Sequence, residues 1–360
     1  MKLLPTTVPT VSLAETRDHA PTGWRPSLIA AIVLGLALLF ALRCGKAPIT
    51  PEMLAHILAQ RLLHFPTAVT WPVGYESILF EIRLPRIVLG ALVGSALATA
   101  GAGYQGLFRN PLADPYLIGV AAGAGLGAVL AFVLPFPAGL YPFGIVQALA
   151  FVGSLFTVTA VYLLARVGRS TRVGTLILAG IALGALMNAA TAYLMYSHGD
   201  KLPMISAWLL GGFNVASWSQ VVLIAPGVLL SIFILLLHSR LLNVMQLGEE
   251  QSASLGMHVE RAKMLLIFAS TLATASAVSV SGLIGFVGLV VPHLTRLLFG
   301  PDHRRLIPTS ALLGAAFLVT ADAVARSLPG SEEVPVGVVT AACGAPFFLF
   351  LLRRQKQEMS

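Results

Sequence analysis

The sequence has few charged residues and few cysteines. Only 11% of its 360 residues are charged, against about 25% in an average soluble domain, and 57% are hydrophobic. A soluble fold of this size could not bury so much apolar surface. The two cysteines, Cys44 and Cys343, lie in or beside apolar stretches without a partner at metal or redox spacing, so we interpret them as packing residues. The composition therefore indicates a membrane protein.

Motifs for catalysis and cofactor binding are also missing. The sequence has no HExxH, no GxSxG, no metal-spaced Cys/His cluster and no Walker-type GxxxxGK[ST]. We therefore expect no catalytic residue, no metal site and no cofactor on this chain, and any ATP and Mg would be used by a separate subunit. The basic residues are scattered between apolar stretches, which argues against nucleic acid as a partner.

The first 26 residues lack the apolar core of a signal peptide. They are rich in proline, and we expect a disordered cytoplasmic tail over residues 1–26 and a second short cytoplasmic tail over residues 355–360.

Long apolar stretches recur along the rest of the chain. A bilayer core needs about 20 mostly apolar helical residues per crossing. The pattern predicts an all-α polytopic membrane protein with about ten transmembrane helices, near residues 27–43, 87–108, 115–134, 143–165, 173–196, 218–238, 263–281, 283–299, 308–328 and 335–352.

The cations divide unequally between the two sides of these spans. Of the 23 lysines and arginines, sixteen lie on the side that carries both termini and seven on the other. The positive-inside rule therefore predicts that both termini are cytoplasmic. The seven outer cations include Arg83, Arg86 and Arg326, which this rule disfavours.

Rows of small residues at four-residue spacing mark the second, third, fifth and tenth spans. One row contains Gly90, Gly94 and Ala98, and residues at this spacing share a helix face where another helix can approach closely. We expect these four spans at the centre of the bundle. Asn188 lies in the row of the fifth span, and an amide at that depth must be paired or face water. Lining of a pathway and simple helix packing both remain open for it.

Acids are scarce inside the spans. Asp322 is the only acid well inside one, and it is placed to pair with Arg326 four residues later. An ion-coupled secondary transporter, the main alternative, usually needs more ionisable residues at this depth.

Three segments resemble a known family. They are QGLFRNPLADPYLIG from Gln105, LGEEQSASLG from Leu247 and GLIGFVGLVVPHLTRLLFGPDHRRLIP from Gly282. Together they are similar to the permease subunits of ATP-binding-cassette importers for iron-siderophores, haem and vitamin B12, known as the FecCD type. The resemblance implies one permease domain over residues 27–354, a homodimer, two ATPase subunits and a periplasmic or lipid-anchored substrate-binding protein. It also implies import by alternating access through a bacterial or archaeal inner membrane, with a ferric siderophore as the first candidate substrate and haem or cobalamin next.

The resemblance further assigns residues to gates. Two prolines and Asp114 make the segment 109–115 a capped turn between helices. In similar permeases this turn contributes to the cytoplasmic gate, which implies gate roles for Asn110 and Leu112. The 168–171 loop is a second gate candidate, through Ser170 and Thr171.

Arg83, Arg86 and Arg326 match arginines that meet glutamates of the binding protein in related permeases. Docking is thus the implied role, and snorkelling of each guanidinium to the interface is the alternative.

The 240–263 segment is too long to be a simple connection between helices. Its acids begin a predicted short helix, and Gly256 is placed to cap the end of that helix. A helix lying on the headgroups is one possibility, although its acids would then face an anionic leaflet. The matching segment of similar permeases inserts into the ATPase, which implies coupling roles for Gly248, Glu249, Glu250, Gln251 and Gly256.

Overall fold

The computed structural model describes residues 25–45, 47, 49–63, 71–137, 144–168, 170–329 and 333–358. Nearly all of the expected N-terminal tail lies outside these residues. At the other end, the last helix continues to Glu358, beyond the expected end near residue 352.

Ten long helices form the body of the described chain, and each corresponds to one of the expected spans. Seven of them are long and apolar enough to cross a bilayer, and the three shorter ones are α5, α13 and the apolar part of α15. Their bounds are α1 (Arg25–Arg43), α4 (Leu84–Phe108), α5 (Val120–Val133), α6 (Ile145–Ala165), α7 (Val173–Ser197), α9 (Trp218–Leu237), α12 (Val259–Ser281), α13 (Val287–Phe299), α14 (His303–Ser327) and α15 (Val336–Glu358).

Short elements join these helices. Apart from the short helix expected within residues 240–263, they were not predicted, because runs of apolar residues do not reveal them. They are α2 (Pro51–Leu63), α3 (Tyr75–Ser77), the π-helix η1 (Ile78–Arg83), the 3-10 helices η2 (Pro115–Ile118) and η4 (Gly199–Lys201), α8 (Leu202–Leu209), α10 (Ser239–Met245), α11 (Glu249–Ser254) and the strands β1 (Arg166–Val167) and β2 (Ser170–Thr171). The two strands form an antiparallel hairpin in which Arg166 is opposite Thr171.

The break between α12 and α13 is longer than the single glycine that we expected. Residues 282–286 are irregular, with positive φ angles at Gly282 (67°) and Phe286 (69°). The Tyr116 hydroxyl from η2 donates a hydrogen bond of 2.9 Å to the Ile284 carbonyl in this segment. Irregular backbone inside a membrane domain is tolerated where the protein satisfies it or where it lines a cavity.

The α4 helix is the centre of the chain and packs against α14, α12, α13 and α9. Its small residues permit very close approach. A Cβ added at Gly94 would lie 2.2 Å from the Gly314 carbonyl oxygen, and one added at Gly101 would lie 1.8 Å from that of Gly288. Gly94 belongs to the predicted row of small residues, which is therefore a real helix–helix contact in this span.

The α7 helix differs from its prediction. Only Leu176, Gly180, Gly184 and Thr191 of this helix are buried, and large side chains such as Leu178, Ile181 and Tyr193 are exposed. The glycine row covers one face, where a Cβ on Gly180 would lie 2.5 Å from the Leu117 carbonyl oxygen, but among the described residues much of the rest of the helix is exposed. The α15 helix is similarly little covered. Placing these two spans at the centre of a single chain was wrong.

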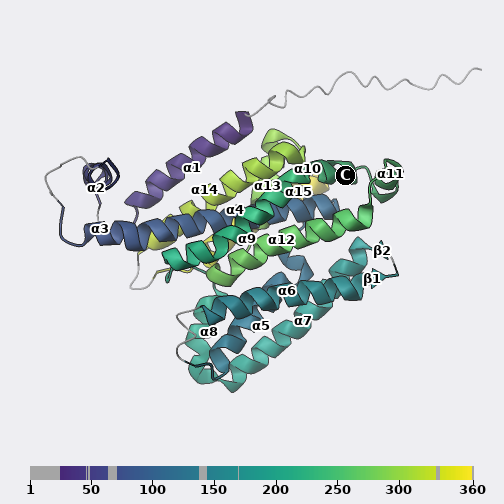
Figure 1. The fold of residues 1–360 in the computed structure, drawn as a ribbon, viewed down its shortest axis with the longest axis horizontal. Helices are drawn as coiled ribbons and strands as arrows, with labels where there is room; N and C mark the ends of the chain where they lie inside the picture. Colours follow the sequence, from purple (N-terminus) through teal and green to yellow (C-terminus); the bar gives the residue numbers. More distant parts are fainter. Residues whose placement is uncertain are drawn as a thin grey trace, which may run out of the picture.

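The short elements gather at opposite ends of the bundle (Figure 1). The hairpin, α10 and α11 lie at one end, here called the α11 end, whereas α2, α3 and α8 lie at the other, here called the α8 end. The α12 helix lies between α4 and α9 on one side and α5 and α6 on the other.

Candidate functional site

A cavity of about 620 Å³ lies where α7, η2 and residues 282–286 meet. Its walls are rich in small residues, and the polar residues among them are Asp114, Tyr116 and Asn188. Asn188 is exposed on α7, on the wall of the cavity. An exposed amide on a helix this apolar is favourable only if it faces water.

Strained backbone borders the same cavity. Phe286 has a φ of 69°, a region that bulky side chains rarely adopt. The ring packs against Gly344 of α15, where an added Cβ would lie 2.4 Å from the Cβ of Phe286. Such strain persists only where neighbouring structure enforces it, and it is often found at functional sites.

The turn over residues 109–114 is held by local hydrogen bonds. Arg109 ends α4 with a φ of 51°, and the Asn110 side chain accepts a hydrogen bond of 2.9 Å from the Leu112 amide. Asp114 caps η2 by accepting a 2.7 Å hydrogen bond from the Tyr116 amide. The expected capped turn is present, with Asn110 exposed and Leu112 half-buried.

The β1–β2 hairpin carries the other predicted gate residues, exposed Ser170 and buried Thr171. The first turn of α12 holds Thr171 by both backbone groups. Its amide donates to Glu260 Oε2 at 3.1 Å, and its carbonyl accepts from Lys263 Nζ at 2.8 Å. Lys263 stands where the 240–263 segment meets the expected span over residues 263–281, and it is only 2% exposed.

The α11 helix has the predicted form. Glu249 and Glu250 occupy its first turn, and glycines with positive φ angles flank it, Gly248 at 111° and Gly256 at 83°. The Met257 amide donates to the Ser252 carbonyl at 3.1 Å across Gly256, which is the hydrogen bond expected at a glycine-capped helix end. Glu250 and Gln251 are exposed.

Both predicted gate elements contact the 240–263 segment. Glu249 of α11 forms an ion pair of 2.7 Å with Lys263, which also pairs with Glu260 at 3.0 Å. We call Lys263, Glu249, Glu260 and Thr171 the lysine cluster.

On the side of the 109–114 turn, Gln246 Nε2 donates to the Gly106 carbonyl at 2.8 Å. A Cβ on Gly248 would lie 3.5 Å from the Arg109 guanidinium. The structure thus brings together residues that the sequence placed in three separate segments.

The α10 helix is fixed to the start of α14. Asn243 Nδ2 donates to Asp302 Oδ1 at 2.6 Å. Burial alone would raise the pKa of Asp302, but this bond and the one from the Arg304 amide lower that pKa below its usual range. The carboxylate is therefore ionised as the cap of α14.

At the α8 end the three predicted docking arginines are buried, with exposures of 3% for Arg83, 6% for Arg86 and 7% for Arg326. Arg86 pairs with Asp322 at 2.9 Å and with Glu333 at 2.7 Å. Arg326 pairs with Asp322 at 3.0 Å, which confirms the predicted contact within α14. We call these five residues the arginine cluster.

Two of these arginines bind the end of α1. Arg83 donates to the carbonyl groups of Leu42 (2.7 Å) and Ala47, and Arg326 donates to that of Cys44 at 3.1 Å. They thereby supply partners for carbonyls at and just beyond the end of the helix.

Snorkelling does not describe these contacts, because the guanidinium groups turn into the protein. Docking presupposed exposed arginines, and in this conformation they are not exposed. Their role in docking remains a prediction.

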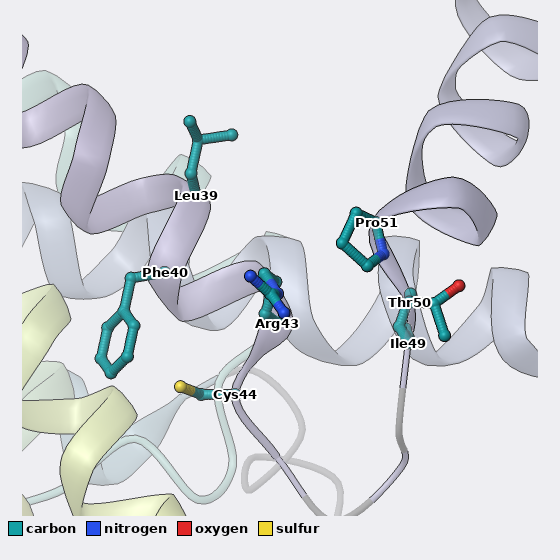
Figure 2. Close-up of a pocket in the computed structure, with 7 residues that line it drawn as sticks. All are labelled: Leu39, Phe40, Arg43, Cys44, Ile49, Thr50 and Pro51. Carbon is teal, nitrogen blue, oxygen red and sulfur yellow. The ribbon is translucent and has the colours of Figure 1, made fainter.

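A separate hollow of about 700 Å³ lies beside this region, between the end of α1 and the start of α2 (Figure 2). Phe40 and Cys44 line it from the α1 side and Ile49 and Pro51 from the α2 side. The described residues that line it include no acid, and it is formed by other elements than the cavity beside Asn188.

Sequence reasoning missed Lys263 and Glu260. The available signal was the spacing of an acid and a base three residues apart at the start of an apolar span, which places both on one helix face.

Comparison with known proteins gives concordant matches. A family model described as the FecCD transport family matches residues 32–354. The cobalamin import system permease protein BtuC of Halobacterium salinarum is 47% identical over 282 residues, which cover 78% of this chain and 75% of that protein. The hemin transport system permease protein HmuU of Yersinia pestis is 44% identical over 286 residues, covering 79% and 85%. A solved structure, described as an inward-facing conformation of an ABC transporter of the metal-chelate type, matches with a TM-score of 0.80 and 33% identity, covering 92% of this chain and 99% of that one.

Proposed function

This chain belongs to the FecCD transport family, and from that premise we propose that two copies of it form the pathway of an ATP-driven importer for a bulky metal chelate. The observation that carries the proposal is the contact of the 240–263 segment with both predicted gate elements. Lys263 donates to the Thr171 carbonyl of the hairpin, and Gly248 lies beside the Arg109 guanidinium of the 109–114 turn. Movement of α11 by a bound ATPase would reach both elements directly. Substrate would cross by alternating access, and the chain would perform no chemistry on it.

The exposed surface of α11 supports an ATPase as its partner. Glu250 and Gln251 are exposed on a helix flanked by Gly248 and Gly256. An anionic headgroup layer would repel the acids Glu249 and Glu250, whereas a protein cleft can pair them with cations. Gly248, Glu249, Glu250, Gln251 and Gly256 are the residues proposed for coupling.

The uncovered side of α7 supports a homodimer. Leu178, Ile181, Tyr193 and Tyr196 are exposed on the helix that carries Asn188. In a dimer with its axis beside this helix, the cavity of one chain would face that of the other. Asn188 would then line a water-filled pathway, and Asn110, Leu112, Ser170 and Thr171 would close its cytoplasmic end.

For the substrate we propose a metal–tetrapyrrole such as haemin or a cobalamin, ahead of the ferric siderophore that the sequence suggested first. The two relatives described above carry names for hemin and cobalamin. The cavity wall is made mainly of glycine, alanine and apolar side chains, which suits a large ligand held by many weak contacts. Binding of cyanocobalamin, haemin and a ferric siderophore to the partner binding protein is the direct measurement.

Docking of a substrate-binding protein is proposed at the α8 end. A carboxylate of that protein could reach Arg86 by replacing Glu333, whose side chain is 30% exposed. Glu333→Gln should then strengthen capture of the binding protein, because it frees one face of a cation. Unchanged or weaker capture would argue that Arg83, Arg86 and Arg326 serve the fold alone.

The test of the proposed function is reconstitution. The chain is purified with its ATPase and binding protein and placed in liposomes. These liposomes should take up cyanocobalamin, haemin or a ferric siderophore, and the uptake should be accompanied by vanadate-sensitive ATP hydrolysis. Uptake driven by an ion gradient without ATP would support the secondary-transporter alternative instead. Asn188→Leu should reduce uptake while the ATPase remains bound, since it removes the polar group from the pathway wall.

Orientation is tested separately. A cysteine at Ser254 in α11 should react with a membrane-impermeant reagent only after cells are opened. Labelling in intact spheroplasts would reverse every assignment of sides made above.

A further inference from the structure

We propose that Lys263 is a positioning residue that transmits movement of α11 to the β1–β2 hairpin. The inference rests on the proposed function, because it assumes that an ATPase moves α11. It assigns to one buried side chain the connection between the segment that would contact the ATPase and a segment that would close the pathway.

The geometry uses the full bonding capacity of the ammonium group. Lys263 has three N–H donors, and they reach Glu249 Oε2 at 2.7 Å, the Thr171 carbonyl at 2.8 Å and Glu260 Oε1 at 3.0 Å. These acceptors come from α11, β2 and α12 respectively. One buried cation therefore holds three elements that are separate in the sequence.

Glu260 adds a second contact between α12 and the hairpin. Its Oε1 accepts from Lys263, while its Oε2 accepts from the Thr171 amide at 3.1 Å. Both backbone polar groups of Thr171 are thus bound by the first turn of α12. The hairpin cannot shift relative to α12 without breaking charge-assisted hydrogen bonds.

Burial turns these bonds into a constraint on movement. A buried ammonium that loses a partner keeps its desolvation cost and gains no water in return. When α11 moves, the arrangement of lowest free energy keeps Glu249 on Lys263, so the first turn of α12 and the hairpin follow. A surface lysine would exchange Glu249 for water and transmit nothing.

Glu249 can contact both Lys263 and a protein bound over α11. Its side chain is 42% exposed although one oxygen binds Lys263. A protein bound over α11 can therefore contact this residue without first breaking the internal pair.

The connection can be tested without knowing the substrate. Ser170, exposed on the hairpin, is changed to cysteine after Cys44 and Cys343 have been replaced by serine. The rate of reaction of this thiol with a water-soluble maleimide is measured in the complete importer, without nucleotide and after trapping of the ATPase with vanadate. With Lys263 present, the two rates should differ by about fivefold or more, the lower range of typical coupling between sites.

Lys263→Met should bring the two rates together while the ATPase still copurifies with the chain. Lys263→Arg, which keeps the charge and donors, should retain most of the difference. Arg261→Met is the matched control, because this exposed cation lies on the same turn of α12 and, among the described residues, forms no hydrogen bond or ion pair with α11 or the hairpin. The Arg261→Met importer should keep the difference between the two reaction rates. If it loses as much of that difference as Lys263→Met does, the effect comes from charge alone and the proposal is overturned.

A Lys263→Met importer with the wild-type difference in rates would also overturn it. If the Lys263→Met variant does not assemble, the same two rates are measured in Glu249→Gln, which leaves the buried lysine and its other two acceptors in place. The difference between the rates should again shrink, and a wild-type difference would overturn the proposal. If even the importer with Lys263 shows no nucleotide-dependent rate, the proposed function itself fails, which distinguishes the two failures.

Discussion

The arginine cluster at the α8 end and the lysine cluster at the α11 end are built from the same chemistry. Each contains at least one buried cation, two carboxylates that pair with such cations and at least one backbone carbonyl bonded to them. They differ in what they join. The arginine cluster ties α4 to α14 and to the end of α1, whereas the lysine cluster ties a six-residue helix and a two-stranded hairpin to the start of α12.

The difference lies in what surrounds the charges. Asp322 is buried among long helices, so its pairs with Arg86 and Arg326 hold packed spans together. In the lysine cluster both carboxylates are partly exposed, and α11 is flanked by glycines in the left-handed region. Buried charges thus act as a fixed joint at one end, and at the other they act as a link to elements able to move.

The largest effect should come from removing the shared carboxylate of the arginine cluster. Asp322→Asn leaves two buried guanidiniums without their common anion, and breaking a buried pair typically costs about 3–5 kcal/mol. We expect a strongly lowered thermal midpoint in detergent and little folded protein in the membrane. Glu333→Gln, at the exposed edge of the same cluster, is the control and should shift the midpoint far less. Equal shifts would mean that burial does not set the strength of this joint.

A smaller effect is expected at the glycines around α11. Gly256 has a φ of 83°, and a side chain in this conformation costs roughly 1–2 kcal/mol. Gly256→Ala should therefore lower ATP-dependent uptake by distorting the return of the chain into α12. Gly174→Ala is the control, because that glycine has no positive φ and nothing within 4 Å of an added Cβ. Equal uptake by both variants would remove the argument that these glycines shape the segment.

The smallest effect on stability should follow Glu249→Gln. Lys263 keeps Glu260 and the Thr171 carbonyl, and a half-exposed ion pair contributes about 1 kcal/mol or less. The thermal midpoint should thus stay close to that of the wild type although coupling is reduced. A loss of stability as large as that of Asp322→Asn would show that both clusters are fixed joints.

The spans were predictable from the sequence because each is a continuous apolar stretch that needs no information from the rest of the chain. The pair of Asp322 and Arg326 was predictable for a similar reason, since four residues on one helix set its geometry. Burial of Arg86 was not, because its partner lies 236 residues away on another span. Charge counting treats every cation outside an apolar stretch as exposed, and that assumption failed for Lys263 as well.

Local signals at the predicted site were reliable, whereas its assembly was not visible in the sequence. The glycine cap at Gly256 and the Asp114 cap of η2 follow from residue type and position. Contact between α11 and the hairpin depends on Lys263 at the start of α12, and no periodic pattern records that contact. The exposed faces of α7 were also unpredictable, because the same apolar composition suits a helix covered by protein, by lipid or by a second copy.

The contacts of the arginine cluster form in a fixed order while the chain is being synthesised. Arg83 can bind the carbonyl groups at the end of α1 as soon as the second span is in place, since both are made early. Arg86 must wait for Asp322, which leaves the ribosome 236 residues later. Until then the nascent chain carries the guanidinium of Arg86 without its partner, in a segment that enters the membrane. The cost of burying this charge falls only when α14 has been made and Asp322 can pair with it. Chains that stop short of α14 would retain that unpaired charge, because they would lack the carboxylate that pairs with Arg86 in the finished protein.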